Sequence, residues 1–184
     1  KMKQLIDAAN PSYGRLWQRD RALVELMYAG GMRASEVAGI KPDDFKETLA
    51  VVMVTGKGNK QRLVPIGKPA IAAIQQYTAE LRPKLLRFDD GRDMGHLLLS
   101  NTGRPLERVS IWQIIRKLAK NADLGKVHPH TLRHSFATHM LSGGADLRVV
   151  QELLGHSDIG TTQIYTHIDR SQLKSVVAKY HPRP

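Results

Sequence analysis

Strand-forming sequence is confined to a short part of this 184-residue chain, and this most limits the folds it can adopt. Residues 48–54 are apolar and β-branched, and residues 61–66 form a second such run. The turn sequence Gly56-Lys-Gly-Asn59 lies between them, so we predict a β-hairpin. Leu97–Leu99 is a candidate strand that would extend the hairpin. Because so small a sheet covers little core, helices must supply the rest.

Apolar residues recur at the helical period in most of the remaining sequence. The segment 14–30 is expected to be an amphipathic helix that ends at Gly30-Gly31, and residues 83–95 are expected to form a loop. Further helices are expected at 33–40, 69–82, 107–121, 130–142, 146–154, 159–167 and 170–179. Since no linker-like segment divides the chain, we predict a single domain over residues 1–184 with a mainly helical α+β fold and a small antiparallel sheet.

The chain is strongly basic, with 28 Lys and Arg against 17 Asp and Glu and a net charge of +11. This excess favours a polyanionic partner, and nucleic acid fits best; a basic surface that only aids solubility is the alternative. No apolar run approaches the roughly 20 residues that span a bilayer, which argues against a membrane partner. The chain has no Cys, which excludes disulfides and thiolate metal sites and fits the reducing cytoplasm.

Arg33 follows a glycine pair and is expected at the entry of a short helix. A cation there can meet an anion that the helix N-terminus also attracts. Glu36 falls on the same helical face, where it can orient Arg33 or cap the helix. Taken alone, Arg33 is equally typical of an ordinary surface arginine.

His130 and Arg133 also share a helical face, so an imidazole and a bidentate guanidinium can reach one phosphate. His134 lies beside them. The plain alternative is a helix that starts at Pro129 and carries solvated histidines. Four nearby histidines raise a zinc hydrolase as another possibility, but the chain has no HExxH motif; these are His128, His130, His134 and His139.

Lys57 lies at the expected hairpin tip, from which it can swing into a groove, although a solubilising loop lysine looks the same. The basic stretch that follows is interpreted as contacts to a phosphate backbone; it comprises Lys60, Arg62 and Lys68.

His156 follows Gly155 and is expected on a turn, and Tyr165 falls late in the next helix. Alone, this histidine is typical of a helix cap and this tyrosine of a half-buried core residue.

Together these residues form an ordered series that resembles the tyrosine recombinases (the phage integrase family), most closely the Xer-type (XerC/XerD) enzymes. The resemblance covers nearly the whole chain, and its motifs are specific. It is carried by Thr131-Leu-Arg-His-Ser-Phe-Ala-Thr-His139, Gly144-Ala-Asp-Leu-Arg-Val-Val-Gln151, Leu154-Gly-His-Ser-Asp158 and Thr162-Gln-Ile-Tyr-Thr-His167.

The resemblance implies a tyrosine recombinase catalytic-domain fold and six catalytic residues. Arg33 and Arg133 would hold the nonbridging oxygens of the scissile phosphate, and His130 and His156 would add further donors. His130 would also handle the tyrosine proton. The remaining two roles are a general acid for the departing 5′-hydroxyl and a nucleophile that forms a 3′-phosphotyrosyl bond, implied for Lys57 and Tyr165 respectively. Because the covalent intermediate keeps the bond energy, no metal, ATP or other cofactor is expected.

The function implied is site-specific recombination of double-stranded DNA, such as chromosome or plasmid dimer resolution. The implied assembly is a synaptic tetramer of this chain, or of this chain with a paralogous recombinase, and a DNA translocase is the implied activator. The N-terminal DNA-clamping domain usual in the family is not expected within these residues. The 170–179 helix is expected to dock on its own domain or on a neighbouring protomer. Alternatives are a mobile-element integrase, a type IB topoisomerase and a non-catalytic DNA-binding module.

Overall fold

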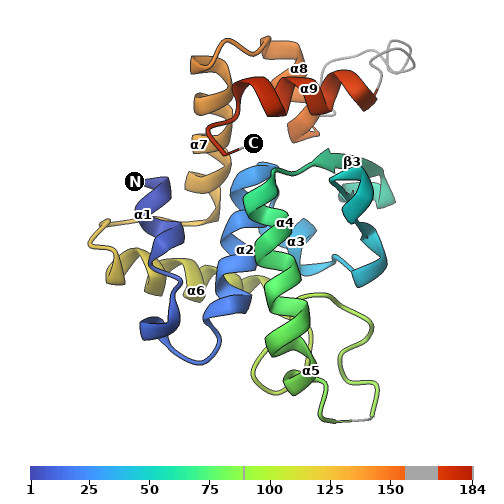
Figure 1. The fold of residues 1–184 in the computed structure, drawn as a ribbon, viewed down its shortest axis with the longest axis vertical. Helices are drawn as coiled ribbons and strands as arrows, with labels where there is room; N and C mark the ends of the chain where they lie inside the picture. Colours follow the sequence, from blue (N-terminus) through green and yellow to red (C-terminus); the bar gives the residue numbers. More distant parts are fainter. Residues whose placement is uncertain (89, 156–169, 184) are drawn as a thin grey trace.

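The structure, a computed structural model, describes residues 1–88, 90–155 and 170–183. Helices dominate these residues, and one small antiparallel sheet lies at the side of the molecule (Figure 1). This arrangement confirms the predicted mainly helical α+β fold.

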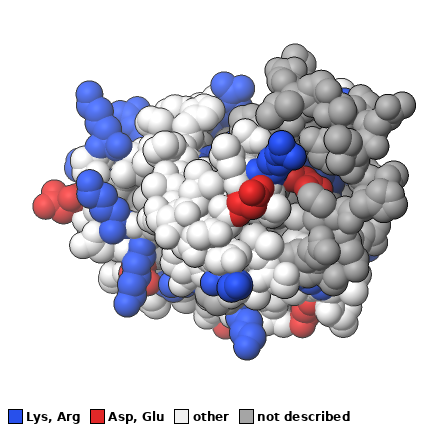
Figure 2. All heavy atoms as spheres, turned by 90° about the horizontal axis from the view of Figure 1, so that it is seen from above, with Lys and Arg blue, Asp and Glu red and all other residues white. Residues whose placement is uncertain are grey.

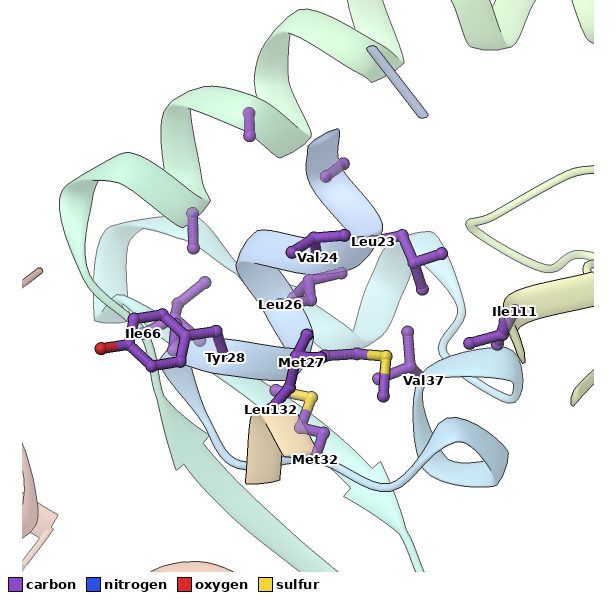
Figure 3. Close-up of a cluster of buried hydrophobic side chains, with 14 of the residues drawn as sticks. Leu23, Val24, Leu26, Met27, Tyr28, Met32, Val37, Ile66, Ile111 and Leu132 are labelled. Atoms are coloured by element: carbon purple, nitrogen blue, oxygen red, sulfur yellow. The ribbon is translucent and has the colours of Figure 1, made fainter. Parts of the chain in front are cut away.

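Helix α2 (Trp17–Ala29) lies at the centre of the fold, and residues on nearly all of its sides are buried. Figure 3 shows its apolar side chains, including Leu23 and Met27, inside the core. The helix predicted within 14–30 and its end at Gly30 are confirmed. Its expected amphipathic character was wrong, because neighbouring helices surround α2 and leave little of it to solvent. Its neighbours are α1 (Met2–Asp7), α3 (Ala34–Ala38), α4 (Lys68–Gln76), α6 (Arg108–Asn121) and α7 (Pro129–Ser142).

The predicted hairpin is confirmed. Strand β2 (Val51–Thr55) pairs antiparallel with β3 (Gln61–Pro65), and Val52 lies opposite Val64. The connecting turn η4 (Lys57–Asn59) places Gly58 at a φ of 73°, which favours glycine. Strand β2 begins later than predicted, because the residues before it form a short 3₁₀ turn, η3 (Glu47–Leu49).

The third strand is not the expected one. Strand β1 (Phe45–Lys46) pairs with β2, whereas Leu97–Leu99 makes only an isolated bridge to Pro105. The Tyr77 hydroxyl donates to the Leu97 carbonyl and accepts from the Leu99 amide, each at 3.1 Å. A buried side chain thus satisfies backbone groups that a sheet would otherwise pair.

Most other helices lie where the sequence predicts them. The helical run after the sheet continues from α4 through a π-helical turn, η5 (Tyr77–Leu81), into α5 (Arg82–Leu85), so the expected loop begins later. Helices α7, α8 (Leu147–Leu154) and α9 (Arg170–Tyr180) form one end of the molecule (Figure 1). The helix expected at 159–167 falls outside the described residues. Two short 3₁₀ turns complete the fold, η1 (Pro11–Tyr13) and η2 (Pro42–Asp44).

The C-terminal segment docks on its own chain. Helix α9 packs against α7 and β3, and Val177 and His181 are buried. Beyond the helix, the Arg183 guanidinium bonds the buried Glu25 carboxylate of α2 at 2.5 Å. Of the two expected docking modes, this structure shows the one on the chain's own domain.

Candidate active site

Arg33 is the N-cap residue of α3, directly after the turn that ends α2. This turn needs a glycine, because Gly31 adopts a φ of +57° and a side chain there would meet Phe136 of α7 at 2.6 Å. The close approach brings the start of α3 against α7 and α8. The Arg33 side chain remains 42% exposed and can reach an external anion.

Glu36 lies in the first turn of α3 with only 2% of its side chain exposed. It accepts hydrogen bonds from the Arg33 amide at 2.8 Å and from Arg33 Nη1 at 3.1 Å. Both expected roles are thus present, since Glu36 caps the helix and orients Arg33. Burial alone would raise the pKa of Glu36, but hydrogen bonds from Arg62 and the Arg33 amide outweigh it and hold the pKa below its usual 4.5.

Arg133 of α7 lies beside this pair. Its Nη1 donates to the Gly31 carbonyl at 2.7 Å and its Nη2 to the Leu154 carbonyl at 2.8 Å. These bonds use two of the five N–H donors of a guanidinium and fix its plane. Burial and then the nearby positive charge of Arg33 lower the pKa of Arg133 to about 10. Two guanidinium groups close enough to repel each other can share an anion.

His130 lies one turn before Arg133 on α7, and its ring is exposed. The indole of Trp112 on α6 contacts it edge-on, with ring centroids 6.1 Å apart. Trp112 also stacks on His128 at 5.3 Å, with an interplanar angle of 20°. Trp112 was not among the site residues predicted from the sequence. The only sequence signal for it was an aromatic residue on a helix that precedes the His-x-x-Arg motif.

The three remaining catalytic candidates are described only in part or not at all. Lys57 lies in the η4 turn, where the structure describes only its backbone, and His156 and Tyr165 fall outside the described residues. The structure thus brings together Arg33, Glu36 and Arg133 and places His130 one turn away. Exposed positions hold the other candidates Lys60, Lys68 and His134.

Arg62 was interpreted from the sequence as a contact to the phosphate backbone, but in the structure its guanidinium is bonded within the protein. Its Nη1 donates to Glu36 Oε1 at 2.7 Å, its Nη2 to Glu36 Oε2 at 3.1 Å, and its Nε to the Leu153 carbonyl at 3.3 Å. Its side chain is only 19% exposed. A contact from Arg62 to DNA stays a prediction, and the guanidinium is already bonded within the protein. The pair lies 26 positions apart in the sequence, so no local pattern could indicate it.

A basic groove of about 600 Å³ lies along α6 beside the Trp112–His128 stack. Four of its lining residues are cationic, which suits a polyanion; they are Arg116, Lys117, Lys120 and Lys126. Seen from above, the described part of the surface shows Lys and Arg at more places than Asp and Glu (Figure 2).

Within residues 1–88, 90–155 and 170–183, no group of three or more His, Cys, Asp or Glu side chains is placed to hold a metal ion. No helix in the same ranges has the length and apolar character to cross a membrane.

Curated relatives of this chain are tyrosine recombinases. Tyrosine recombinase XerD of Halalkalibacterium halodurans is 48% identical over 166 residues, which cover 90% of this chain and 54% of that protein. The chain spans about half the length of the curated relatives it matches.

Solved structures share the fold. The XerA recombinase has a TM-score of 0.74 and 34% identity, over 100% of this chain and 64% of that one. The XerH site-specific recombinase bound to difH substrate has a TM-score of 0.70 and 26% identity, over 90% of this chain and 48% of that one. The observed fold is therefore that of a tyrosine recombinase catalytic domain. The phage integrase family model matches residues 1–172, and the chain belongs to the phage integrase family.

Proposed function

We propose that residues 1–184 form the catalytic domain of an Xer-type site-specific DNA recombinase. The observation that carries this proposal is the meeting of Arg33 and Arg133 at the end of α8, directly before His156 in the sequence. A phosphodiester held there would have two fixed cations on its nonbridging oxygens, with His130 one helical turn away. Fixed donors of this kind stabilise the charge that develops in phosphoryl transfer.

In the proposed reaction, the Tyr165 phenolic oxygen attacks the phosphorus and the bond to the 5′-oxygen breaks. His130 assists removal of the phenolic proton, Lys57 protonates the departing 5′-oxygen, and His156 adds a donor to the phosphate. The 3′-phosphotyrosyl bond keeps the energy of the broken bond. A 5′-hydroxyl from the same or another strand then attacks this bond and releases Tyr165.

The proposed substrate is a double-stranded recombination site, which the basic groove along α6 and its four cations support. In two related structures the XerH recombinase is bound to a difH substrate, which supports DNA as the partner of this chain. The finer proposal is chromosome or plasmid dimer resolution in the cytoplasm by a tetramer of this chain, alone or with a paralogous recombinase. A DNA translocase is the proposed activator.

A nicked suicide substrate tests the reaction class. We expect the protein to form a covalent adduct with such DNA without added metal or ATP, and Tyr165→Phe to bind the same DNA without forming the adduct. The substitution removes one hydroxyl, so the free energy of unfolding should change little. An adduct that persists in Tyr165→Phe would refute the assignment of the nucleophile, and no adduct with the unaltered protein would refute the proposed function.

A further inference from the structure

Arg62 joins three parts of the candidate active site. It lies on β3, just after the turn that carries Lys57, and its guanidinium spans both oxygens of Glu36, at 2.7 and 3.1 Å. A parallel fork of this kind fixes direction as well as distance. Glu36 in turn holds the Arg33 amide and guanidinium. The position of the hairpin is thus linked to that of Arg33 through one buried carboxylate.

The same guanidinium also holds the end of α8. Arg62 Nε donates to the Leu153 carbonyl, while Arg133 Nη2 takes the next carbonyl, that of Leu154. Gly155 lies directly over Arg62, since a Cβ added there would be 3.1 Å from Cζ, Nε and Nη1. Two arginines therefore satisfy the last carbonyls of this helix, which a helix leaves unpaired. In the sequence, His156 follows this end directly.

We infer that Arg62 is a positioning residue that aligns the Lys57 hairpin and the Gly155 end of α8 with Glu36 and Arg33. The inference rests on the proposed function. It revises the sequence-based interpretation of Arg62 as a phosphate contact, because all three nitrogens of its guanidinium already donate within the protein. Loss of this alignment would displace Lys57, which protonates the leaving group, more than it would weaken DNA binding.

The substitution that separates the two roles is Arg62→Lys. A lysine keeps the positive charge that a phosphate contact needs. It cannot bridge both oxygens of Glu36 and also reach the Leu153 carbonyl. We therefore expect Arg62→Lys to bind nicked DNA with an unchanged salt dependence. Its single-turnover cleavage at saturating DNA should fall by about 10²-fold, the usual effect of a displacement near 1 Å. Thermal unfolding would verify that Arg62→Lys is folded at the assay temperature.

A substrate with a 5′-bridging sulfur supplies the second readout, because a thiolate leaves without a proton. If Arg62 positions Lys57, the sulfur substrate should recover much of the rate lost in Arg62→Lys, as it should in Lys57→Ala. General destabilisation would slow both substrates equally and would overturn the inference.

Lys60→Ala is the matched contrast, since Lys60 is an exposed cation two positions away. It should weaken binding and reduce the salt slope by about one. The inference is also wrong if Arg62→Lys cleaves at the unaltered rate, or if Arg62→Ala reproduces the pattern of Lys60→Ala. Failure of the unaltered protein to form any adduct would instead refute the proposed function.

Discussion

Arg33 and Arg133 lie close enough for their charges to interact but are held differently. Arg133 donates to two backbone carbonyls, whereas Arg33 is bound by one carboxylate and remains 42% exposed. Replacing either with alanine should slow cleavage by about 10²–10³-fold, the usual effect of removing one transition-state donor. Arg133→Ala should lower the free energy of unfolding more than Arg33→Ala, because it leaves the Gly31 and Leu154 carbonyls without their donors, whereas Glu36 keeps Arg62 when Arg33 is lost.

Single-turnover cleavage and urea unfolding of the two variants would measure this difference. An unchanged cleavage rate in either variant at saturating DNA would contradict the shared-phosphate arrangement. Equal stability losses would mean that the two carbonyl bonds of Arg133 contribute little to the fold.

At the scale of elements, the end of α8 depends on a glycine. Gly155 has a φ of +65°, and the space above it is filled by Arg62. Gly155→Ala should lower the free energy of unfolding by about 1–2 kcal/mol through left-handed strain alone, and by more because the guanidinium must move. Gly125→Ala is the matched control, since Gly125 has a φ of +58° and no atom near its missing Cβ. Denaturant titration should show the larger loss for Gly155→Ala; equal losses would mean that Arg62 moves aside freely.

Elements with local signals were predictable from the sequence. The hairpin followed from two apolar runs around a glycine turn, and the capping role of Glu36 followed from its spacing to Arg33. The partners of buried polar groups were not predictable. Tyr77 takes the place of a strand beside Leu97, and Arg62 joins Glu36 across 26 positions. Such pairings depend on how helices and strands pack, and the identity of a distant polar partner leaves no periodic pattern in the sequence.

At the scale of the whole molecule, the C-terminal segment closes the fold over α2 and α7. His181 is 4% exposed and packs against the rings of Tyr28 and Phe136. Burial, opposed by hydrogen bonding with Arg183 and Tyr28 and aided by the charges of His139 and Arg183, places the pKa of His181 below its usual 6.5. The folded protein thus binds this proton less readily than the unfolded chain does.

The contribution of His181 to the free energy of unfolding should therefore be fully present above about pH 6.5 and fall as the pH drops toward the lower pKa of the folded state. The slope from this one group is at most about 1.4 kcal/mol per pH unit. Urea unfolding at several pH values would measure the slope. His181→Gln, which does not titrate, should show a shallower loss than the unaltered protein. An identical pH dependence in both would exclude His181 as a source of the acid sensitivity.

The buried pair of Glu36 and Arg62 has a consequence for how this sequence can change over generations. Loss of Arg62 alone removes two charge-assisted hydrogen bonds from the buried Glu36 carboxylate and leaves it with Arg33. Each such bond contributes about 1.5–3 kcal/mol. Loss of Glu36 alone leaves Arg33, Arg62 and Arg133 close together without the carboxylate between them. Domains of this size have only about 5–15 kcal/mol to lose. A protein that has lost only one of the two residues is thus substantially less stable. Related sequences should therefore keep Glu36 and Arg62 together or replace both.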